Sequence, residues 1–229
     1  MTDGRYPAPS PRGSTAAEDY VKVIYAHTEW QDEPMMPSQL ATRLGLAAST
    51  VTEMVKKLAV SGLVRHRPYG AIELTPDGRL LALRLLRRHR LIETWLVSQL
   101  GYGWDEVHDE ADVLEHAMSD RLVEALAASL GHPVRDPHGD AIPTADGAMP
   151  AHDARALLEL QAGESGTVTR ISDSDPELLR YLASNGIDLD VVVTVAERGK
   201  YSGTLLVRTP DADVHLSPEA AGAVWVRGD

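Results

Sequence analysis

The segment HDEADVLEH, residues 108–116, places four carboxylates and two imidazoles within nine positions. At helical spacing, Asp112, Glu115 and His116 point to one side, and His108 lies one turn earlier on nearly the same side. Carboxylates three residues apart repel one another unless a cation lies between them. The segment therefore predicts a divalent metal site. The alternative is an ordinary charged helix face in contact with water.

A second pair of this kind lies upstream, where His89 and Glu93 are four residues apart. Taken alone, such a pair is more typical of a surface ion pair. Two helices that each present a carboxylate and an imidazole can, however, converge on a metal. The chain has no cysteine, so a metal here must be held by oxygen and imidazole nitrogen.

The segments that carry these residues are predicted to be helical. Residues 79–102 and 105–131 predict two helices, one for each set of ligand-type side chains. Residues 14–30 predict an earlier helix, with Thr15 and Glu18 as its capping box. The Pro-, Gly- and Ser-rich leader before it is expected to be disordered.

Residues 36–64 have the pattern of a helix-turn-helix. Leu40 and Leu44 mark a short amphipathic helix, Gly45 permits a tight turn, and Ala48 or Ser49 begins a second helix. Two ordinary helices of a small α domain would show the same periodicity. Residues 61–78 then read as two short strands around a turn, which is the position of a wing.

The outward side of the second helix offers side chains that suit DNA. Hydroxyl and carboxylate groups can bond base edges, and basic groups can bond phosphates. The predicted DNA contacts are Ser49, Thr50, Glu53, Lys56, Lys57, Arg43, Arg65 and Arg67. The net charge of −12 is uneven: residues 1–90 hold 13 Lys and Arg against 9 Asp and Glu, and the remainder 9 against 25. Only the N-terminal part is therefore expected to meet a polyanion.

Residues from about 150 onward read as a separate, mostly β domain. Short β-rich runs alternate with turns, and PELLRYLASNG predicts one brief helix with a glycine stop. The pattern predicts a small barrel. Its acidic charge makes direct contact with DNA unfavourable.

Together, the helix-turn-helix and the segments RRHRLIE, VHDEADVLEHAMSD and DPHGDAIP resemble the diphtheria toxin repressor family of metal-activated transcriptional regulators. The resemblance covers nearly the whole chain. It implies a mainly α protein with some β structure: a winged helix-turn-helix DNA-binding domain at 1–76, a helical dimerisation and metal-binding domain at 77–148, and a small Src-homology-like β-barrel at 149–229.

The resemblance also implies two metal sites. The regulatory site would take Asp19, Asp112, Glu115 and His116. The ancillary site would take His89, Glu93 and His108, with Asp173 and Asp175 from the β domain. Loop and helix-cap roles are an equal alternative for Asp173 and Asp175.

The choice of metal follows from the ligand types. Iron-sensing members have Met and Cys where this chain has Asp19 and Asp112, and two carboxylates make a hard site suited to Mn²⁺. Fe²⁺ or Co²⁺ are expected to bind in vitro. Short manganese regulators use a Glu at the position of Lys22 to hold a second, adjacent metal, which a charged lysine cannot do.

The sequence thus predicts a manganese-activated regulator that represses manganese uptake genes, and no enzyme activity. It is expected to be a homodimer in the cytoplasm, bound to double-stranded DNA at an inverted-repeat operator. The chain has no run of about 20 apolar residues that would span a membrane. Three alternatives remain: an iron(II)-responsive repressor of the same family, a di-metal hydrolase, and a winged-helix regulator of a small organic ligand.

Overall fold

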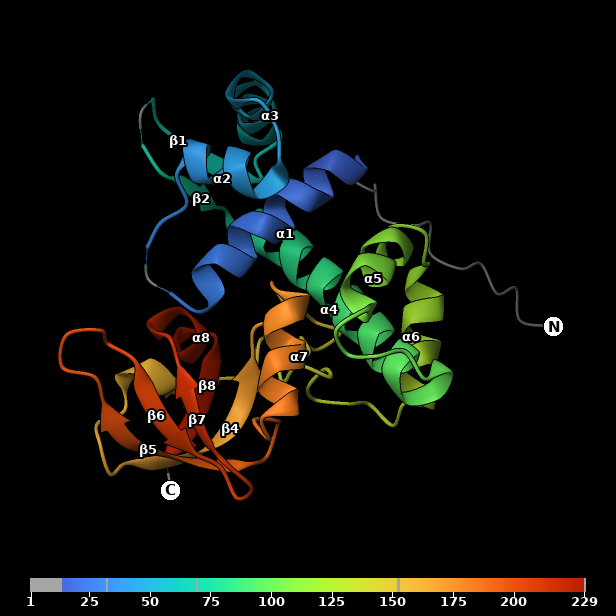
Figure 1. Ribbon diagram of the computed structural model, residues 1–229. Coiled ribbons are helices and arrows are strands. Elements are labelled where there is room, and N and C mark those ends of the chain that lie inside the picture. The colour runs from blue at the N-terminus through green and yellow to red at the C-terminus, as the bar shows by residue number, and fades with distance from the viewer. Residues whose placement is uncertain (1–13, 32, 69, 152, 229) are drawn as a thin grey trace. The chain divides into compact units, whose positions relative to one another are not determined.

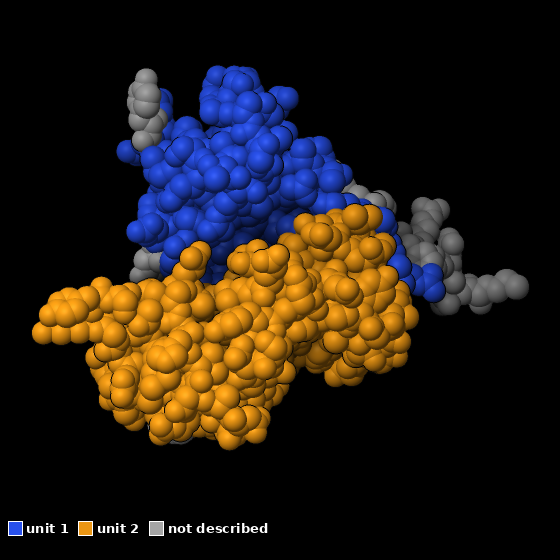
Figure 2. All heavy atoms as spheres, viewed as in Figure 1, with its two compact units in different colours: residues 1–89, 115–125, 143–149 blue, residues 90–114, 126–142, 150–229 orange. Residues whose placement is uncertain are grey.

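The computed structural model describes residues 14–31, 33–68, 70–151 and 153–228. They form two compact units, which Figure 2 colours separately: the described residues up to 89 together with 115–125 and 143–149, and residues 90–114 and 126–142 together with the described residues from 150 onward. The predicted disordered leader, residues 1–13, lies outside the described residues.

The first unit contains the predicted winged helix-turn-helix (Figure 1). Its elements are α1 (Thr15–Glu29), α2 (Pro37–Leu44), α3 (Ala48–Val60), β1 (Val64–His66) and β2 (Ile72–Leu74). Gly45 ends α2 with a φ of 64°, a left-handed conformation that glycine adopts without steric cost. The strands β1 and β2 pair antiparallel and form the wing.

Helix α1 begins one residue earlier than the predicted capping box requires. Ser14 is the N-cap, and its side chain accepts a hydrogen bond from the backbone N–H of Ala17. Glu18 is therefore not at the position where a capping box would place it. Its side chain is buried and lies on the side of α1 that faces His116.

Apolar side chains of α1, α2 and α3 share one core. Val21 and Ile24 of α1, Leu40 of α2, and Val51 and Val55 of α3 are all at most 1% exposed in the same cluster. Burial of each such side chain contributes about 1.5–3 kcal/mol to folding. The position of α1 is therefore linked by packing to that of α3.

The helices of the central segment are α4 (Pro76–Leu100), α5 (Val107–Glu115) and α6 (Asp120–Ser129). The sequence predicts one continuous helix over residues 105–131, and the structure breaks it after Glu115. Ser119 directly precedes α6, and its Oγ accepts a hydrogen bond from the N–H of Leu122 at 3.3 Å. The break leaves His116 just beyond the end of α5.

The C-terminal segment of the second unit is built on one antiparallel sheet (Figure 1). Its elements are β3 (Arg155–Ala156), the 3₁₀ turn η1 (Leu157–Glu159), β4 (Ser165–Ile171), α7 (Pro176–Ser184), β5 (Val192–Arg198), β6 (Leu205–Arg208), β7 (Asp213–Leu216), α8 (Pro218–Gly222) and β8 (Val224–Gly228). The strand order is β3-β8-β4-β5-β6-β7. Among the described residues no pairing joins β3 to β7, so the sheet is open where the sequence predicts a closed barrel.

No helix in the described part of the chain has both the length and the hydropathy to cross a membrane.

Candidate metal centres and nucleic-acid interface

Three ligand-type side chains meet in the first unit. The Nε2 atom of His116 lies 2.9 Å from Oδ1 of Asp19 and 3.4 Å from Oε1 of Glu115. One ligand atom from each of the three lies within 4.8 Å of the others. We call Asp19, Glu115 and His116 the first centre. Its oxygen and imidazole donors fit a hard or borderline divalent ion.

Glu18 orients the imidazole of the first centre. Its Oε2 lies 2.8 Å from Nδ1 of His116. A proton on Nδ1 leaves Nε2 as the nitrogen that faces Asp19 and Glu115. A carboxylate behind a ligand histidine fixes its tautomer and the orientation of its ring. Sequence reasoning assigned Glu18 to capping and missed this role.

The first centre is largely buried, and burial affects its protonation. Glu115 is fully buried, whereas the side chain of Asp19 is 41% exposed. Burial raises the pKa of the Asp19 carboxyl, and the neighbouring His116 acts in the opposite direction. A proton therefore competes with a metal for Asp19 more strongly than for a solvated aspartate.

Two further predicted ligands, His89 and Asp112, each lie close to an oppositely charged or ligand-type side chain. Nδ1 of His89, predicted for the ancillary site, lies 2.8 Å from Oε2 of Glu115 within the first unit. Asp112 belongs to the second unit, where its Oδ2 lies 3.9 Å from Nε2 of His108.

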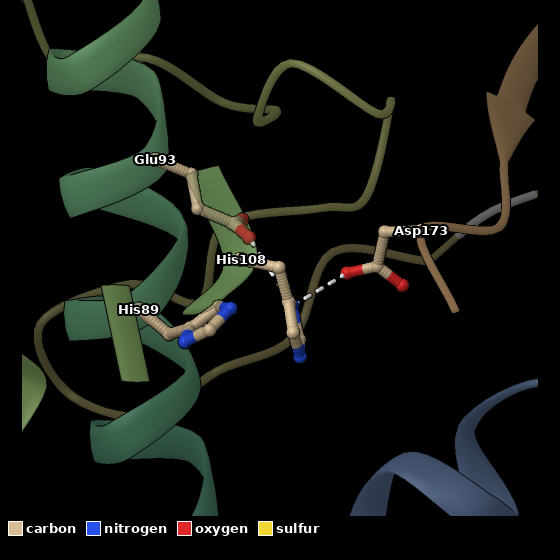
Figure 3. A group of neighbouring side chains, drawn as sticks. All are labelled: His89, Glu93, His108 and Asp173. Carbon is tan, nitrogen blue, oxygen red and sulfur yellow. Dashed lines mark ion pairs between the residues drawn. The ribbon is translucent and has the colours of Figure 1, made fainter. Parts of the chain in front are cut away.

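A second group of ligand-type side chains lies in the second unit. Nδ1 of His108 is 3.5 Å from Oε1 of Glu93 and 3.2 Å from Oδ2 of Asp173. Figure 3 shows these three side chains, together with His89 one turn before Glu93 on α4. Glu93 also groups with Asp136 and His138, with one ligand atom of each within 4.8 Å. We call Glu93, His108, Asp136, His138 and Asp173 the second centre.

His138 gives this second centre a metal-type donor. The side chain is fully buried, and its Nε2 lies 2.7 Å from the backbone oxygen of Trp104, which accepts the ring proton. Its Nδ1 has no hydrogen-bond partner among the described residues and lies 3.9 Å from Oε2 of Glu93. A buried nitrogen lone pair directed at a carboxylate fits a divalent cation.

Asp136 and His138 were not selected from the sequence, although the segment DPHGDAIP contributed to the resemblance. Asp136 is buried, and its Oδ1 accepts hydrogen bonds from the N–H groups of His138 and Asp140. Burial, together with the carboxylates of Asp140 and Glu93, raises the pKa of Asp136 well above its usual value. Asp175 instead caps α7, because its Oδ1 accepts from the N–H of Glu177 at 2.9 Å.

The loop that carries Asp136 and His138 is fixed to β4. The N–H of Ile171 donates to the carbonyl oxygen of His138 at 2.9 Å. Nε of Arg170 donates to Oδ1 of Asp140 at 2.7 Å, and both side chains are buried. A Cβ at Gly139, where φ is +91°, would lie 2.0 Å from the carbonyl oxygen of Thr169. Only glycine allows this approach.

We expect Gly139→Ala to destabilise the protein by about 3 kcal/mol or more, because it combines backbone strain with a clash against backbone atoms. Gly163→Ala is the matched control: Gly163 has a φ of +89°, but a Cβ there meets nothing within 4 Å. It should cost about 1 kcal/mol, from strain alone. Thermal unfolding of both variants measures the difference. Equal losses would show that β4 does not hold the loop closely.

The predicted DNA contacts form an exposed set on α2, α3 and the wing. All eight residues, Arg43, Ser49, Thr50, Glu53, Lys56, Lys57, Arg65 and Arg67, are exposed. Nζ of Lys56 lies 2.7 Å from Oε1 of Glu53, and this hydrogen bond lowers the pKa of the Glu53 carboxyl. Both side chains are more than 60% exposed, so the pair can open toward a nucleic acid at little cost.

Comparison with known protein families gives three matches along the chain. Residues 14–72 match the iron dependent repressor N-terminal DNA binding domain, and residues 75–144 match the iron dependent repressor metal binding and dimerisation domain. Residues 155–228 match the FeoA domain.

Individual relatives match over most of their length. The iron-dependent repressor IdeR of Mycobacterium tuberculosis (strain ATCC 25618 / H37Rv) is 33% identical over 223 residues, which cover 91% of this chain and 95% of the relative. The diphtheria toxin repressor of Corynebacterium diphtheriae (strain ATCC 700971 / NCTC 13129 / Biotype gravis) is 36% identical over 207 residues, which cover 88% and 81%.

A solved structure of a manganese-dependent transcriptional repressor in complex with manganese is 51% identical, with a TM-score of 0.90; the match covers 93% of this chain and all of that one. A helical DNA-binding segment, a helical metal-binding and dimerisation segment and an open antiparallel FeoA sheet thus follow one another along the chain. The chain belongs to the iron-dependent repressor family of metal-dependent transcriptional repressors, and it is not an enzyme.

Proposed function

We propose that this protein represses manganese uptake genes when Mn²⁺ binds its first centre. The observation that carries the proposal is the 2.9 Å approach of Asp19 on α1 to His116 beyond α5. The donors of this centre are carboxylate oxygen and imidazole nitrogen, without sulfur. Such donors suit Mn²⁺, and a 51% identical solved relative is named as manganese-dependent.

The proposed mechanism links the first centre to α3 through α1. A bound divalent ion supplies the positive charge that lets Asp19 and Glu115 stay close together. Because α1 shares its core with α2 and α3, holding Asp19 against residues 115–116 also holds α3. Repression then requires both recognition helices of a homodimer at the spacing of successive major grooves, on an inverted-repeat operator. Binding of the ion shifts the population toward that arrangement.

The family resemblance adds further ligands to the two centres. We propose Asp112 as a fourth ligand of the first centre and His89 as a further ligand of the second. Asp173 and His108 are proposed as ligands of the second centre, whereas the capping contact of Asp175 gives it a structural role. We also propose three functional domains at 1–76, 77–148 and 149–229, with a barrel-like C-terminal domain, and a cytoplasmic protein.

The test is a fluorescence-anisotropy titration on promoter DNA from upstream of a manganese transporter. The protein should bind tightly with Mn²⁺ and lose this affinity when a chelator is added. Parallel titrations with Fe²⁺ and Co²⁺, carried out anaerobically, compare the metals directly. DNA affinity that is unchanged by chelation would contradict metal activation, and a response to Fe²⁺ alone would identify an iron-responsive repressor.

Two substitutions on α3 separate phosphate contacts from base contacts. Lys56→Ala should weaken binding to all DNA sequences and reduce the slope of log affinity against log salt by about 0.9, because one phosphate contact is lost. Glu53→Ala should alter the preference among operator variants. Anisotropy at several salt concentrations on specific and scrambled DNA measures both. An equal loss on every sequence for Glu53→Ala would make it a positioning residue.

A further inference from the structure

A cationic side chain of the protein itself contacts the first centre. Nζ of Lys22, on α1, lies 2.6 Å from Oε1 of Glu115, and the two residues are 93 positions apart. The side chain of Lys22 is 13% exposed and that of Glu115 is 0% exposed. An ion pair so far removed from solvent is screened much less than one at the surface.

This pair uses the same oxygen that faces the other ligands. Oε1 of Glu115 also lies 3.4 Å from Nε2 of His116, whereas Oε2 lies 2.8 Å from Nδ1 of His89. Oε1 is therefore the Glu115 atom that points into the first centre. A metal bound in the first centre would therefore share Oε1 of Glu115 with the Lys22 ammonium or displace it.

The charges around the pair explain why a lysine is tolerated here. Glu18, Asp19 and Glu115 bring three carboxylates to one small region of the first unit, and Lys22 and His116 lie among them. Without a nearby cation, a fully buried carboxylate such as Glu115 would be strongly destabilising. In the metal-free protein Lys22 supplies part of the positive charge that a metal would otherwise bring.

We propose that Lys22 competes with the activating metal for Oε1 of Glu115 and thereby sets the metal concentration at which the regulator responds. The inference rests on the proposed metal role of the first centre. A divalent ion has to displace the ammonium from this oxygen or bind beside its positive charge, and both weaken the apparent affinity. Lys22 is thus a residue that tunes sensitivity, and it does not act as a ligand.

A purely structural role for Lys22 predicts the opposite change in Mn²⁺ affinity. If Lys22 only kept Glu115 in place, a neutral residue would disorder Glu115 and weaken metal binding. If Lys22 competes, Lys22→Met should tighten Mn²⁺ binding by about tenfold or more, because a like charge in direct contact with a ligand atom is removed. The direction of the change therefore separates the two roles.

The experiment is an EPR titration that follows the signal of free Mn²⁺ in the full-length protein. All proteins carry His108→Ala, which weakens the second centre through a side chain that is 45% exposed. Lys22→Met is compared with the Lys22 protein, and Lys200→Met is the charge-matched control on the β5–β6 connection. A thermal melt with and without Mn²⁺ gives a second measurement. Lys22→Met should lower the melting temperature of the metal-free protein and enlarge the shift that Mn²⁺ produces.

Lys22→Arg keeps the charge and serves as a second variant if Lys22→Met fails to fold. A guanidinium pairs with a carboxylate more strongly than an ammonium does, so this variant should bind Mn²⁺ more weakly. Unchanged or weaker Mn²⁺ binding by a folded Lys22→Met, or unchanged binding by Lys22→Arg, would overturn the competition. Failure of the proposed function looks different: the Lys22 protein would bind no Mn²⁺ that His116→Ala removes.

Discussion

His116→Ala is expected to abolish metal-activated DNA binding, with a loss of at least about 100-fold in operator affinity at saturating Mn²⁺ for the parent protein. His116 is the one imidazole of the first centre, and its Nε2 lies 2.9 Å from Oδ1 of Asp19. The substitution removes the link from α1 to the segment after α5. Anisotropy with operator DNA measures the loss, and an EPR titration shows whether the bound ion has disappeared.

Two further variants show whether the loss is specific to the ligand role of His116. Glu18→Gln keeps the ligand but changes the acceptor for Nδ1 of His116, so Mn²⁺ affinity should fall by about tenfold while activation at high Mn²⁺ remains. His215→Ala, an exposed histidine of β7, should leave both affinities unchanged. Operator binding by His116→Ala that still needs Mn²⁺ at the parental concentration would remove the first centre from the mechanism.

Asp19→Met combined with Asp112→Cys is expected to change which metal activates the protein. Both substitutions replace hard carboxylate oxygen with soft sulfur, which favours Fe²⁺, Co²⁺ or Ni²⁺ over Mn²⁺. The Mn²⁺ concentration for half-maximal DNA binding should rise by roughly 100-fold, since the Asp19 oxygen and the oxygen of the proposed ligand Asp112 are both replaced by sulfur, which suits Mn²⁺ poorly. Affinity alone does not decide the matter, because most nitrogen and oxygen sites bind these other ions at least as tightly as Mn²⁺.

The appropriate measurement is the order in which the four ions activate DNA binding, titrated anaerobically for both proteins. Asp19→Asn with Asp112→Asn is a useful control, since it removes the charges without adding sulfur. It should weaken the response to every ion and keep the order. If the sulfur variant keeps the parental order as well, the carboxylates do not choose the metal.

Local patterns were sufficient to predict most of the elements. The spacing of Leu40, Leu44 and Gly45 predicted α2 and its end, and the alternation around residues 64–74 predicted the wing. The break between α5 and α6 was not predicted, because residues 116–119 lack proline and glycine and the helical periodicity continues through them. The open edge of the sheet depends on long-range pairing, which a local pattern does not contain.

The candidate centres were predictable where helical spacing brings residues together. Glu115 and His116 are adjacent in the chain, and Asp19 came from the family resemblance. Glu18 was missed because its partner lies 98 positions away. The contact of Lys22 with Glu115, which lowers the repulsion among the carboxylates, was missed for a similar reason, since the two residues are 93 positions apart.

The second centre shows the same limit. Asp136 and His138 stand in a loop, where no periodicity marks a shared face. Their significance appears only from burial, the bond to the Trp104 carbonyl and the proximity of Glu93. Two acidic residues flanking a histidine in the segment DPHGD were the available signal.

The contact between β4 and the loop at residues 136–140 bears on how far the chain can be divided. Arg170 of β4 neutralises Asp140, which also lies 3.3 Å from Nη2 of Arg90 on α4. A chain shortened before β4 would lose Arg170 and Asp173 together. It would also expose the loop in which Asp136 and Asp140 are buried. Removal of the FeoA segment, by recombination or by proteolysis, would therefore destabilise the helical part that remains.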